Sequence, residues 1–227
     1  MKPLSQPNVL ITGGTAGLGL ALVEQFRRHG SRVATFARHV HQPIKTPELT
    51  VFNADVSKKD EIHSIAARAF EALGHIDVLV NNASSLGPTP LGPLLDLDCE
   101  DFESVLQVNL VGPFRLTKLI AADMLKRKRG LIVNVSSDAA INGYPGWGPY
   151  GASKAALDQM SRVLDAELSP HGVRSIAVDP GDMRTPLHFL AIPDANPEAL
   201  KDPKISAAQI LDLFPAFFGN PQPRYKL

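Results

Sequence analysis

The chain has 227 residues, of which 44% are hydrophobic, so it can bury one sizeable core and is expected to form a single domain over residues 1–227. Its 23 lysines and arginines balance 23 aspartates and glutamates, and this net charge of +0 leaves no global electrostatic case for binding nucleic acid or a membrane. One cysteine, Cys99, excludes an internal disulfide framework and fits a reducing compartment. The N-terminal stretch lacks a signal-peptide core, and no apolar run approaches the ~18 residues of a membrane span, so a soluble, cytoplasmic protein is expected.

The first predicted strand, residues 8–12, runs directly into a glycine-rich turn, and a helix is predicted over residues 20–29. A strand, a turn and a helix in this order present backbone N–H groups and a helix N-terminus to a phosphate. The spacing Gly13-x-x-x-Gly17-x-Gly19 is not the G-x-G-x-x-G form, and no Gly-Lys-Ser/Thr follows, so a P-loop is disfavoured. A glycine turn without a ligand is the less favoured alternative.

The second predicted strand, residues 32–37, ends where a dinucleotide-binding fold would contact the adenosine ribose. NAD sites commonly place an acidic residue there to hold the 2′-hydroxyl, but this chain has Ala37 followed by Arg38. Because no carboxylate repels a 2′-phosphate and a guanidinium can pair with it, NADP(H) is favoured over NAD(H). An ordinary solvated arginine is the alternative interpretation.

The rest of the chain continues the alternation of strands and helices. Four further strands are predicted, over residues 49–53, 77–80, 131–135 and 174–178. Three long helices are predicted, over residues 58–73, 98–129 and 150–169. Pro113 must kink or break the second of these helices. Residues 191–204 are predicted to form a loop, 206–213 a short helix, and 215–227 a proline-rich tail with at most a stub of strand at 224–227.

Six strands alternating with helices predict an α/β fold: a Rossmann-type, doubly wound parallel sheet in three α/β/α layers, with an abbreviated C-terminal strand region. In such sheets, ligands bind outside the carboxyl ends of the strands. Four segments with site-like composition follow predicted strands, and we expect them to meet at that edge: the glycine turn, Asn81–Ala83, Ser136–Ser137 and Pro180–Gly181.

Tyr150 and Lys154 are four residues apart, so on a helix they share one face. A phenol with a pKa of roughly 10 is a poor acid or base at pH 7, and a nearby ammonium group would lower that pKa. A hydroxyl from Ser136 or Ser137 beside the pair could hold a carbonyl oxygen while the phenol donates a proton to it. The stretch therefore predicts carbonyl or alcohol chemistry.

Along most of its length the chain resembles the short-chain dehydrogenase/reductase family. The segment Thr12-Gly13-x-x-x-Gly17-Leu18-Gly19 is similar to the family's cofactor turn, and Asn81-Asn82-Ala83-Ser84 is similar to its Asn-Asn-Ala-Gly motif, with Ser84 in place of glycine. Tyr150 to Lys154 fits the Tyr-x-x-x-Lys signature, and Pro180-Gly181-x-x-x-Thr185 resembles the segment that closes on the nicotinamide. The 13-residue separation between Ser137 and Tyr150 (150 − 137) is the family's catalytic spacing, which selects Ser137 over Ser136.

The resemblance implies hydride transfer between a nicotinamide and a carbonyl or alcohol carbon. Tyr150 would be the general acid in reduction and the base in oxidation, and Lys154 would lower its pKa and bind the nicotinamide ribose. Ser137 would hydrogen-bond the substrate oxygen. Asn109, in Val-Asn-Leu-Val-Gly-Pro-Phe, matches the family's fourth catalytic residue and would hold a water in a proton relay behind Lys154.

The resemblance also implies a set of cofactor contacts. Gly13 to Gly19 would seat the pyrophosphate, and Arg38 fits NADP-preferring members of the family. Ala16 stands where many of those members have a second basic residue, so the 2′-phosphate would rest on Arg38 alone. The expected contacts are Gly13, Thr15, Gly17, Leu18, Gly19, Arg38, Asp55, Val56, Asn82, Ala83, Lys154, Pro180, Gly181 and Thr185.

Residues 185–227 form the variable substrate-loop and C-terminal segment, and a mostly apolar set is expected to face the substrate. The set comprises Ser84 to Leu86, Ser137, Asp138, Trp147, Met183, Leu187, His188 and Phe189. It suits a non-anionic ketone or aldehyde. The leading prediction is NADPH-dependent reduction of such a carbonyl. The alternatives are an NAD-dependent alcohol dehydrogenase and a non-catalytic nucleotide-sensing module. The short tail puts the family's usual tetramer in doubt, while a homodimer through the long helices stays open.

Overall fold

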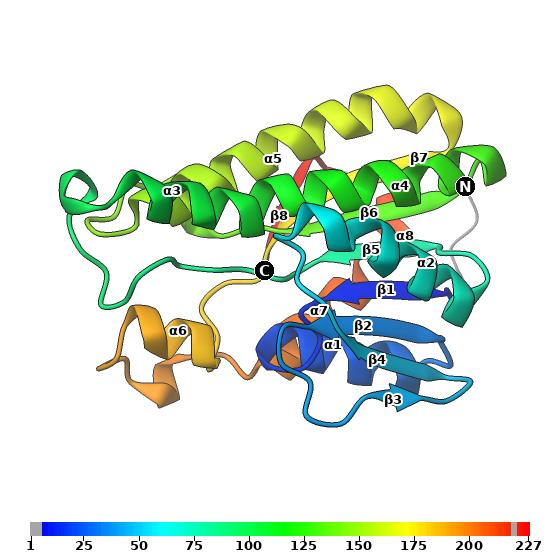
Figure 1. The fold of residues 1–227 in the computed structure, drawn as a ribbon, viewed down its shortest axis with the longest axis horizontal. Coiled ribbons are helices and arrows are strands. Elements are labelled where there is room, and N and C mark those ends of the chain that lie inside the picture. Colours follow the sequence, from blue (N-terminus) through cyan, green and yellow to red (C-terminus); the bar gives the residue numbers. More distant parts are fainter. Residues whose placement is uncertain (1–5, 219–221) are drawn as a thin grey trace.

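The computed structural model describes residues 6–218 and 222–227, and it contains one eight-stranded sheet flanked by helices (Figure 1). The strand order is β3-β4-β2-β1-β5-β6-β7-β8, and the pairs are parallel except β3–β4, which is antiparallel. The strands are β1 (Val9–Thr12), β2 (Val33–Ala37), β3 (Ile44–Lys45), β4 (Leu49–Asn53), β5 (Val78–Asn81), β6 (Gly130–Val135), β7 (Val173–Asp179) and β8 (Arg224–Lys226).

The helices form a layer on each face of the sheet because strand side chains alternate between the two faces. Val9 and Ile11 of β1 pack in the core under α1, α7 and α8, whereas Leu10 packs in the core under α2 and α4. The helix α5 lies on the latter face, where Ser161 accepts a hydrogen bond from Asn134 of β6. The bounds are α1 (Gly17–Arg28), α2 (Ile62–Leu73), α3 (Cys99–Leu106), α4 (Gly112–Arg127), α5 (Gly148–Leu168), α6 (Pro186–Ala191), α7 (Pro203–Asp212) and α8 (Phe214–Phe218).

The predicted α/β sheet with an abbreviated last strand is confirmed. All six predicted strands are present, and the stub at the C-terminus is β8, which pairs with β7. The pattern missed β3, a two-residue strand, and the short helices α6 and α8. Residues 219–221 of the predicted tail lie outside the described residues.

The long helix predicted around Pro113 is interrupted. It consists of α3, a π-helical turn over Gln107–Val111, and α4, which has Pro113 in its first turn. The cause is local, because proline has no N–H and cannot continue the α-helical bonding of the preceding turn. The break has a consequence for the site, since Asn109 lies within the π turn.

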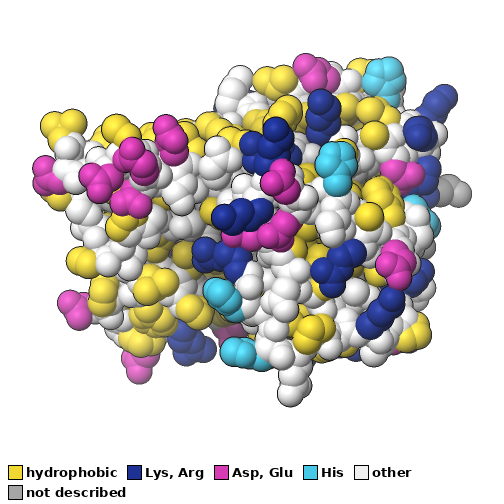
Figure 2. Space-filling view, viewed as in Figure 1, with side chains coloured by type: hydrophobic (Ala, Val, Ile, Leu, Met, Phe, Trp, Pro, Cys, Tyr) yellow, Lys and Arg dark blue, Asp and Glu magenta, His cyan; other side chains and the backbone are white. Residues whose placement is uncertain are grey.

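Four consecutive basic residues, 126–129, lie at the end of α4, and Arg127 among them forms ion pairs. Arg127 donates to Asp123 at 2.8 Å and to Asp77 at 3.0 Å, which ties α4 to the start of β5. Figure 2 shows charges of both signs side by side over the middle of this face, with acidic side chains gathered at the end that carries α3. No helix among the described residues is long and apolar enough to cross a membrane.

Candidate active site

The glycine turn after β1 is shaped by three positions that have no room or no backbone freedom for a side chain. Gly13 has φ 70° and Gly17 has φ 52°, which is left-handed backbone that L residues with side chains rarely adopt. A Cβ at Gly19 would lie 2.1 Å from the Gly13 carbonyl oxygen. The turn therefore needs glycine for its conformation and for the close approach of α1.

We expect Gly19→Ala to destabilise the protein by about 2 kcal/mol, because the added methyl group overlaps fixed backbone. The measurement is urea-induced unfolding of the variant against wild type. Gly143→Ala is the matched control, since a Cβ at Gly143 would meet nothing within 4 Å. Equal stabilities of the two variants would contradict this account of the turn.

The end of β5 holds the glycine turn in place. The Thr12 hydroxyl oxygen accepts the N–H groups of Asn82 at 3.0 Å and Ala83 at 2.8 Å. The Asn82 side-chain amide donates in turn to the carbonyl oxygens of Thr12 at 2.9 Å and Gly13 at 3.1 Å. Asn82 therefore acts through its amide as a tie between two loops that both border the site.

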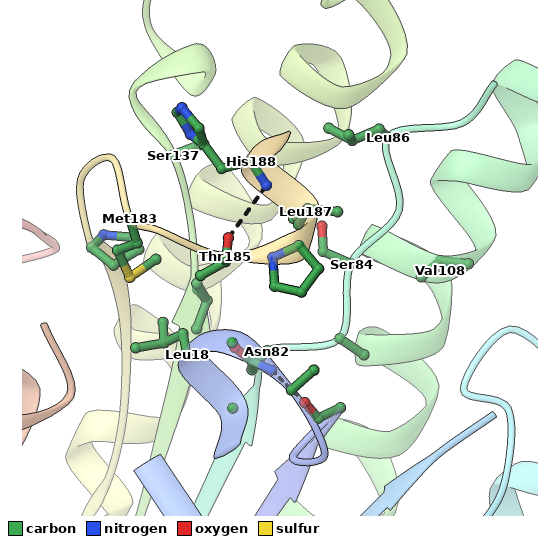
Figure 3. Close-up of a pocket in the computed structure, with 18 of the residues that line it drawn as sticks. Leu18, Asn82, Ser84, Leu86, Val108, Ser137, Met183, Thr185, Leu187 and His188 are labelled. Carbon is green, nitrogen blue, oxygen red and sulfur yellow. Dashed lines mark hydrogen bonds between the residues drawn. The ribbon is translucent and has the colours of Figure 1, made fainter. Parts of the chain in front are cut away.

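A cavity of about 320 Å³ opens at the carboxyl ends of the strands and connects this turn with the predicted catalytic residues. Figure 3 shows Ser84 and Leu86, after β5, across the cavity from Leu187 and His188 of α6. Of the predicted residues outside the catalytic set, those that line the cavity are Gly13, Gly17, Leu18, Gly19, Arg38, Asp55, Val56, Asn82, Ala83, Ser84, Leu86, Trp147, Pro180, Gly181, Met183, Thr185, Leu187 and His188.

Some predicted residues lie outside the cavity lining. Thr15 is exposed on the outer side of the turn. Asp138 accepts from the hydroxyl of Tyr144 at 2.7 Å and from that of Ser137 at 3.2 Å, so it braces the loop after β6. Phe189 packs its ring against His188. The side chains of Thr15, Asp138 and Phe189 are therefore not among those that line the cavity.

The catalytic side chains predicted at the start of α5 do converge. Tyr150 is buried with 7% of its surface exposed, and its hydroxyl hydrogen-bonds with those of Ser137 and Ser84. Lys154 is buried one turn further along, where its Nζ donates to the carbonyl oxygen of Val135 at 2.7 Å. The same Nζ lies 5.4 Å from the centre of the Tyr150 ring. Ser84, the residue that departs from the glycine of the motif, thus reaches the phenol.

Burial dominates the protonation of this pair. It raises the pKa of Tyr150 to about 12, against the hydrogen bond from Ser137, which acts to lower it. It lowers the pKa of Lys154 to about 8, against the nearby charge of Asp158. The expectation that Lys154 lowers the pKa of Tyr150 is therefore wrong for this structure. At neutral pH the phenol is protonated.

Asn109 is buried behind the catalytic pair, and its side chain is fully engaged. Its Oδ1 accepts from the Ser85 N–H at 2.8 Å, and its Nδ2 donates to the Ser85 carbonyl at 2.9 Å and to the Ser153 hydroxyl at 2.9 Å. The amide thereby links the loop after β5 to α5. Pro113, four residues on, lacks the N–H that an α-helix would direct at the Asn109 carbonyl oxygen.

The substrate end of the cavity is mainly apolar. Leu86, Ala139 and Tyr150 form a buried cluster against which Trp147 and Leu187 pack. The Trp147 ring meets that of Tyr150 edge to face, with centroids 5.5 Å apart, so it supports the phenol and lines the cavity as well.

The adenosine end of the cavity carries Arg38, whose side chain is exposed at the end of β2. Nearby, the Asp55 carboxylate accepts the N–H and the hydroxyl of Ser57 at 2.9 and 2.8 Å, which fixes the loop after β4. Val56 is buried beside it. A cation and apolar surface therefore border the end of the cavity where the sequence predicts the adenosine.

Sequence reasoning missed several residues that touch the site. Asp179 ends β7 and lines the cavity, and its Oδ1 accepts the Gly181 N–H at 3.0 Å. Arg224 of β8 donates to the Ser137 carbonyl oxygen at 2.8 Å. An acid at the end of a strand gave a weak signal for Asp179, but nothing in the pattern of a three-residue strand indicated Arg224.

A parallel sheet, a glycine turn between β1 and α1, and a Tyr–Lys pair facing the same cavity define a Rossmann-type oxidoreductase. The chain belongs to the short-chain dehydrogenase/reductase family, since the family model described as short chain dehydrogenase matches residues 7–191. It is an NAD(P)-dependent oxidoreductase of that family.

Relatives and solved structures agree with this assignment. The chain is 32% identical over 187 residues to 2-(R)-hydroxypropyl-CoM dehydrogenase of Xanthobacter autotrophicus, covering 78% of this chain and 75% of that protein. It is 34% identical over 186 residues to 3-oxoacyl-(acyl-carrier-protein) reductase FabG of Thermotoga maritima, covering 78% and 74%. A solved short chain dehydrogenase/reductase family protein superposes with a TM-score of 0.87 at 29% identity, covering 100% of this chain and 97% of that one. A short-chain dehydrogenase from Streptomyces avermitilis gives 0.83 at 26% identity, covering 97% and 88%.

Proposed function

We propose that this protein reduces a ketone or aldehyde to the alcohol with NADPH, with Tyr150 as the general acid. The observation that carries the proposal is the buried Tyr150 phenol, hydrogen-bonded to Ser137 at the wall of a cavity that reaches the glycine turn. A phenol whose pKa is raised to about 12 is protonated at neutral pH, so it carries the proton that a general acid must supply. Reduction requires this protonated form of the phenol at the start of the reaction.

The roles of the residues follow from where their polar atoms lie. The Ser137 hydroxyl holds the carbonyl oxygen of the substrate, and Tyr150 donates its proton as negative charge develops there. The Ser84 hydroxyl, which also bonds the phenol, orients it. When bound, NADPH supplies the hydride that the carbonyl carbon accepts. The side chain of Asn109 fixes the loop after β5 against α5. Because Pro113 has no N–H to donate to the backbone carbonyl oxygen of Asn109, this oxygen is suited to hold a water of a proton relay.

The residues along the cavity fit a dinucleotide. Backbone N–H groups of the turn from Gly13 to Gly19 would bind the pyrophosphate at the N-terminus of α1. Gly17 approaches Thr185 so closely that a Cβ there would lie 3.2 Å from the threonine side chain, so the cavity narrows where the pyrophosphate would pass. Lys154 would bind the nicotinamide ribose, and its pKa of about 8 leaves it mostly protonated at pH 7.

The preference for NADPH rests on Arg38. We expect Arg38→Ala to raise the KM for NADPH about tenfold and the KM for NADH less than twofold, because one charge-assisted contact to the 2′-phosphate is lost. The measurement is steady-state kinetics with both cofactors. Arg28→Ala, at an exposed arginine of α1 outside the cavity lining, is the matched control and should change neither KM. Equal increases for the two cofactors in Arg38→Ala would refute the preference.

The substrate we propose is neutral and largely apolar, because Leu86, Trp147 and Leu187 bound the space in front of the phenol. The names of the two relatives, a dehydrogenase of a hydroxyalkyl compound and a reductase of an oxoacyl compound, support the same type of reaction.

A panel of neutral ketones and aldehydes with NADPH and with NADH tests the proposal. Turnover of these carbonyls with NADPH is expected, whereas oxidation of the corresponding alcohols with NAD⁺ alone would favour the dehydrogenase alternative. Cytoplasmic location and assembly as a homodimer stay predictions.

A further inference from the structure

The strand β8 is only three residues long and lies at the edge of the sheet, yet the side chain of its first residue contacts α5, β7 and the loop after β6. The Arg224 side chain is 14% exposed, and its guanidinium makes three contacts. Its Nε donates to Asp158 of α5 at 2.8 Å, and its Nη2 donates to Asp179 of β7 at 3.1 Å and to the Ser137 carbonyl oxygen at 2.8 Å. One side chain therefore connects three elements that meet at the active site.

Each of these three partners adjoins the proposed catalytic machinery. Asp158 lies four residues after Lys154 and so on the same face of α5. Asp179 lines the cavity and accepts the N–H of Gly181, in the loop expected to close on the nicotinamide. The Ser137 carbonyl belongs to the residue whose hydroxyl bonds the phenol. Both carboxylates are almost fully buried, at 3% and 2% side-chain exposure.

We propose that Arg224 is a positioning residue of the active site: it fixes the backbone that carries Ser137 and offsets part of the charge of the two buried carboxylates beside the Tyr150–Lys154 pair. This inference rests on the proposed function. The proposed role is compatible with the shortness of β8, since a strand of three residues is long enough to place the Arg224 side chain. The backbone N–H of Leu227 donates to the Asp179 carbonyl at 3.0 Å and holds the strand in that register.

The electrostatic consequence has a definite sign. A carboxylate favours the charged form of a nearby lysine and the neutral form of a nearby phenol, and it does so more strongly when its own cationic partner is lost. Asp158 acts in this way on Lys154, raising its pKa against the effect of burial. Asp179 and Asp138 act in this way on Tyr150, in the same direction as burial. Loss of Arg224 leaves Asp158 and Asp179 unbalanced, so the pKa of Lys154 must rise.

The fall of kcat/KM at alkaline pH, which is the alkaline limb of the pH profile, reports this change in the pKa of Lys154. In wild type, kcat/KM for reduction is expected to fall with an apparent pKa near 8, as Lys154 loses its proton. Arg224→Met should move this limb upward by about one pH unit. The charge-balanced double variant Arg224→Met/Asp158→Asn should return it to within about 0.3 unit of wild type. A limb that stays in place in Arg224→Met overturns the electrostatic part of the proposal.

Arg174 supplies a matched control. It also joins β7 to α5 by an arginine–aspartate pair, with Nε and Nη2 each 2.8 Å from Asp165, but it lies near the opposite end of the strand. Arg174→Met should lower the thermal midpoint without moving the alkaline limb. An equal pH shift in both arginine variants would show a general effect of destabilisation and would overturn the inference.

Arg224→Lys separates the two parts of the proposal and covers the case in which the methionine variant does not fold. A lysine keeps the charge, so the alkaline limb should stay within about 0.3 pH unit of wild type. It cannot bond all three acceptors with a planar fork, so kcat should fall about tenfold while the KM for NADPH stays within about twofold. Unchanged kcat would overturn the positioning role. Wild type without turnover on any carbonyl would instead count against the proposed function, so the two failures are distinguishable.

Discussion

Replacing Tyr150 by phenylalanine is expected to lower kcat for NADPH-dependent reduction about 1,000-fold, within the roughly 10²–10⁴-fold contribution of a positioned general acid. The change removes one hydroxyl, the one that bonds Ser137 and Ser84. The ring remains, so its edge-to-face contact with Trp147 at 5.5 Å persists. Stability and NADPH affinity should therefore change little, and the loss should appear in kcat.

The measurement is single-turnover reduction followed by the loss of NADPH absorbance, with NADPH affinity determined by fluorescence. Tyr225→Phe is the matched control, because the same chemical change is made at a residue whose hydroxyl oxygen accepts the N–H of Gln222 near the surface. It should retain activity within about twofold. If Tyr150→Phe turned over as fast as wild type, the assignment of the general acid would be wrong.

Replacing Lys154 by methionine is expected to lower kcat/KM by about two orders of magnitude and, at the same time, to stabilise the protein at neutral pH. The stabilisation arises because burial lowers the pKa of Lys154 from 10.5 to about 8, so holding the charged lysine inside the fold costs roughly 3 kcal/mol. The hydrogen bond from Nζ to the Val135 carbonyl is lost in the variant, which offsets about 1 kcal/mol. A net gain of about 2 kcal/mol remains at pH 7.

The pH dependence of this gain in stability tests whether the gain comes from removing the buried charge of Lys154. Between pH 8 and 10.5 the unfolded chain binds more protons at this lysine than the folded protein does, so wild-type stability rises with pH through that window. The advantage of Lys154→Met should therefore be complete below pH 8 and lost above pH 10.5, where the missing Nζ hydrogen bond leaves the variant about 1 kcal/mol less stable than wild type. Urea-induced unfolding at pH 7 and pH 10 tests this, with Lys118→Met on the outer side of α4 as control. A variant that is less stable than wild type at pH 7 would contradict it.

The sheet and the cavity were predictable because the signals are local. The apolar runs that became β1, β5, β6 and β7 need only the periodicity of a strand to be recognised, and a parallel sheet brings their carboxyl ends to one edge. The resemblance to the family then selects Ser137 over Ser136 by its distance to Tyr150 in the sequence, and the structure places Ser137, Tyr150 and Lys154 at one cavity. Short elements such as β3 and α6 were missed because two to six residues carry too little pattern.

The electrostatics of the site could not be read in the same way. Proximity of Tyr150 and Lys154 along a helix predicts a lowered phenol pKa, but the outcome depends on how far the fold removes both groups from water. For Tyr150 that burial comes in part from Leu86 and Leu187, which pack over the ring from distant parts of the chain. The contacts of Arg224 were hidden for a related reason, since its partners are 45, 66 and 87 residues away.

Transfer of deuterium from cofactor to product tests the central claim most directly. The enzyme is incubated with NADPH in which both hydrogens at the reactive carbon of the nicotinamide are deuterium and with the best neutral ketone of the panel, and the alcohol is analysed by mass spectrometry. The account predicts an alcohol one mass unit heavier, labelled at the carbinol carbon, whose formation is lost in Tyr150→Phe. An unlabelled alcohol, or oxidation of NADPH without formation of any alcohol, would contradict it.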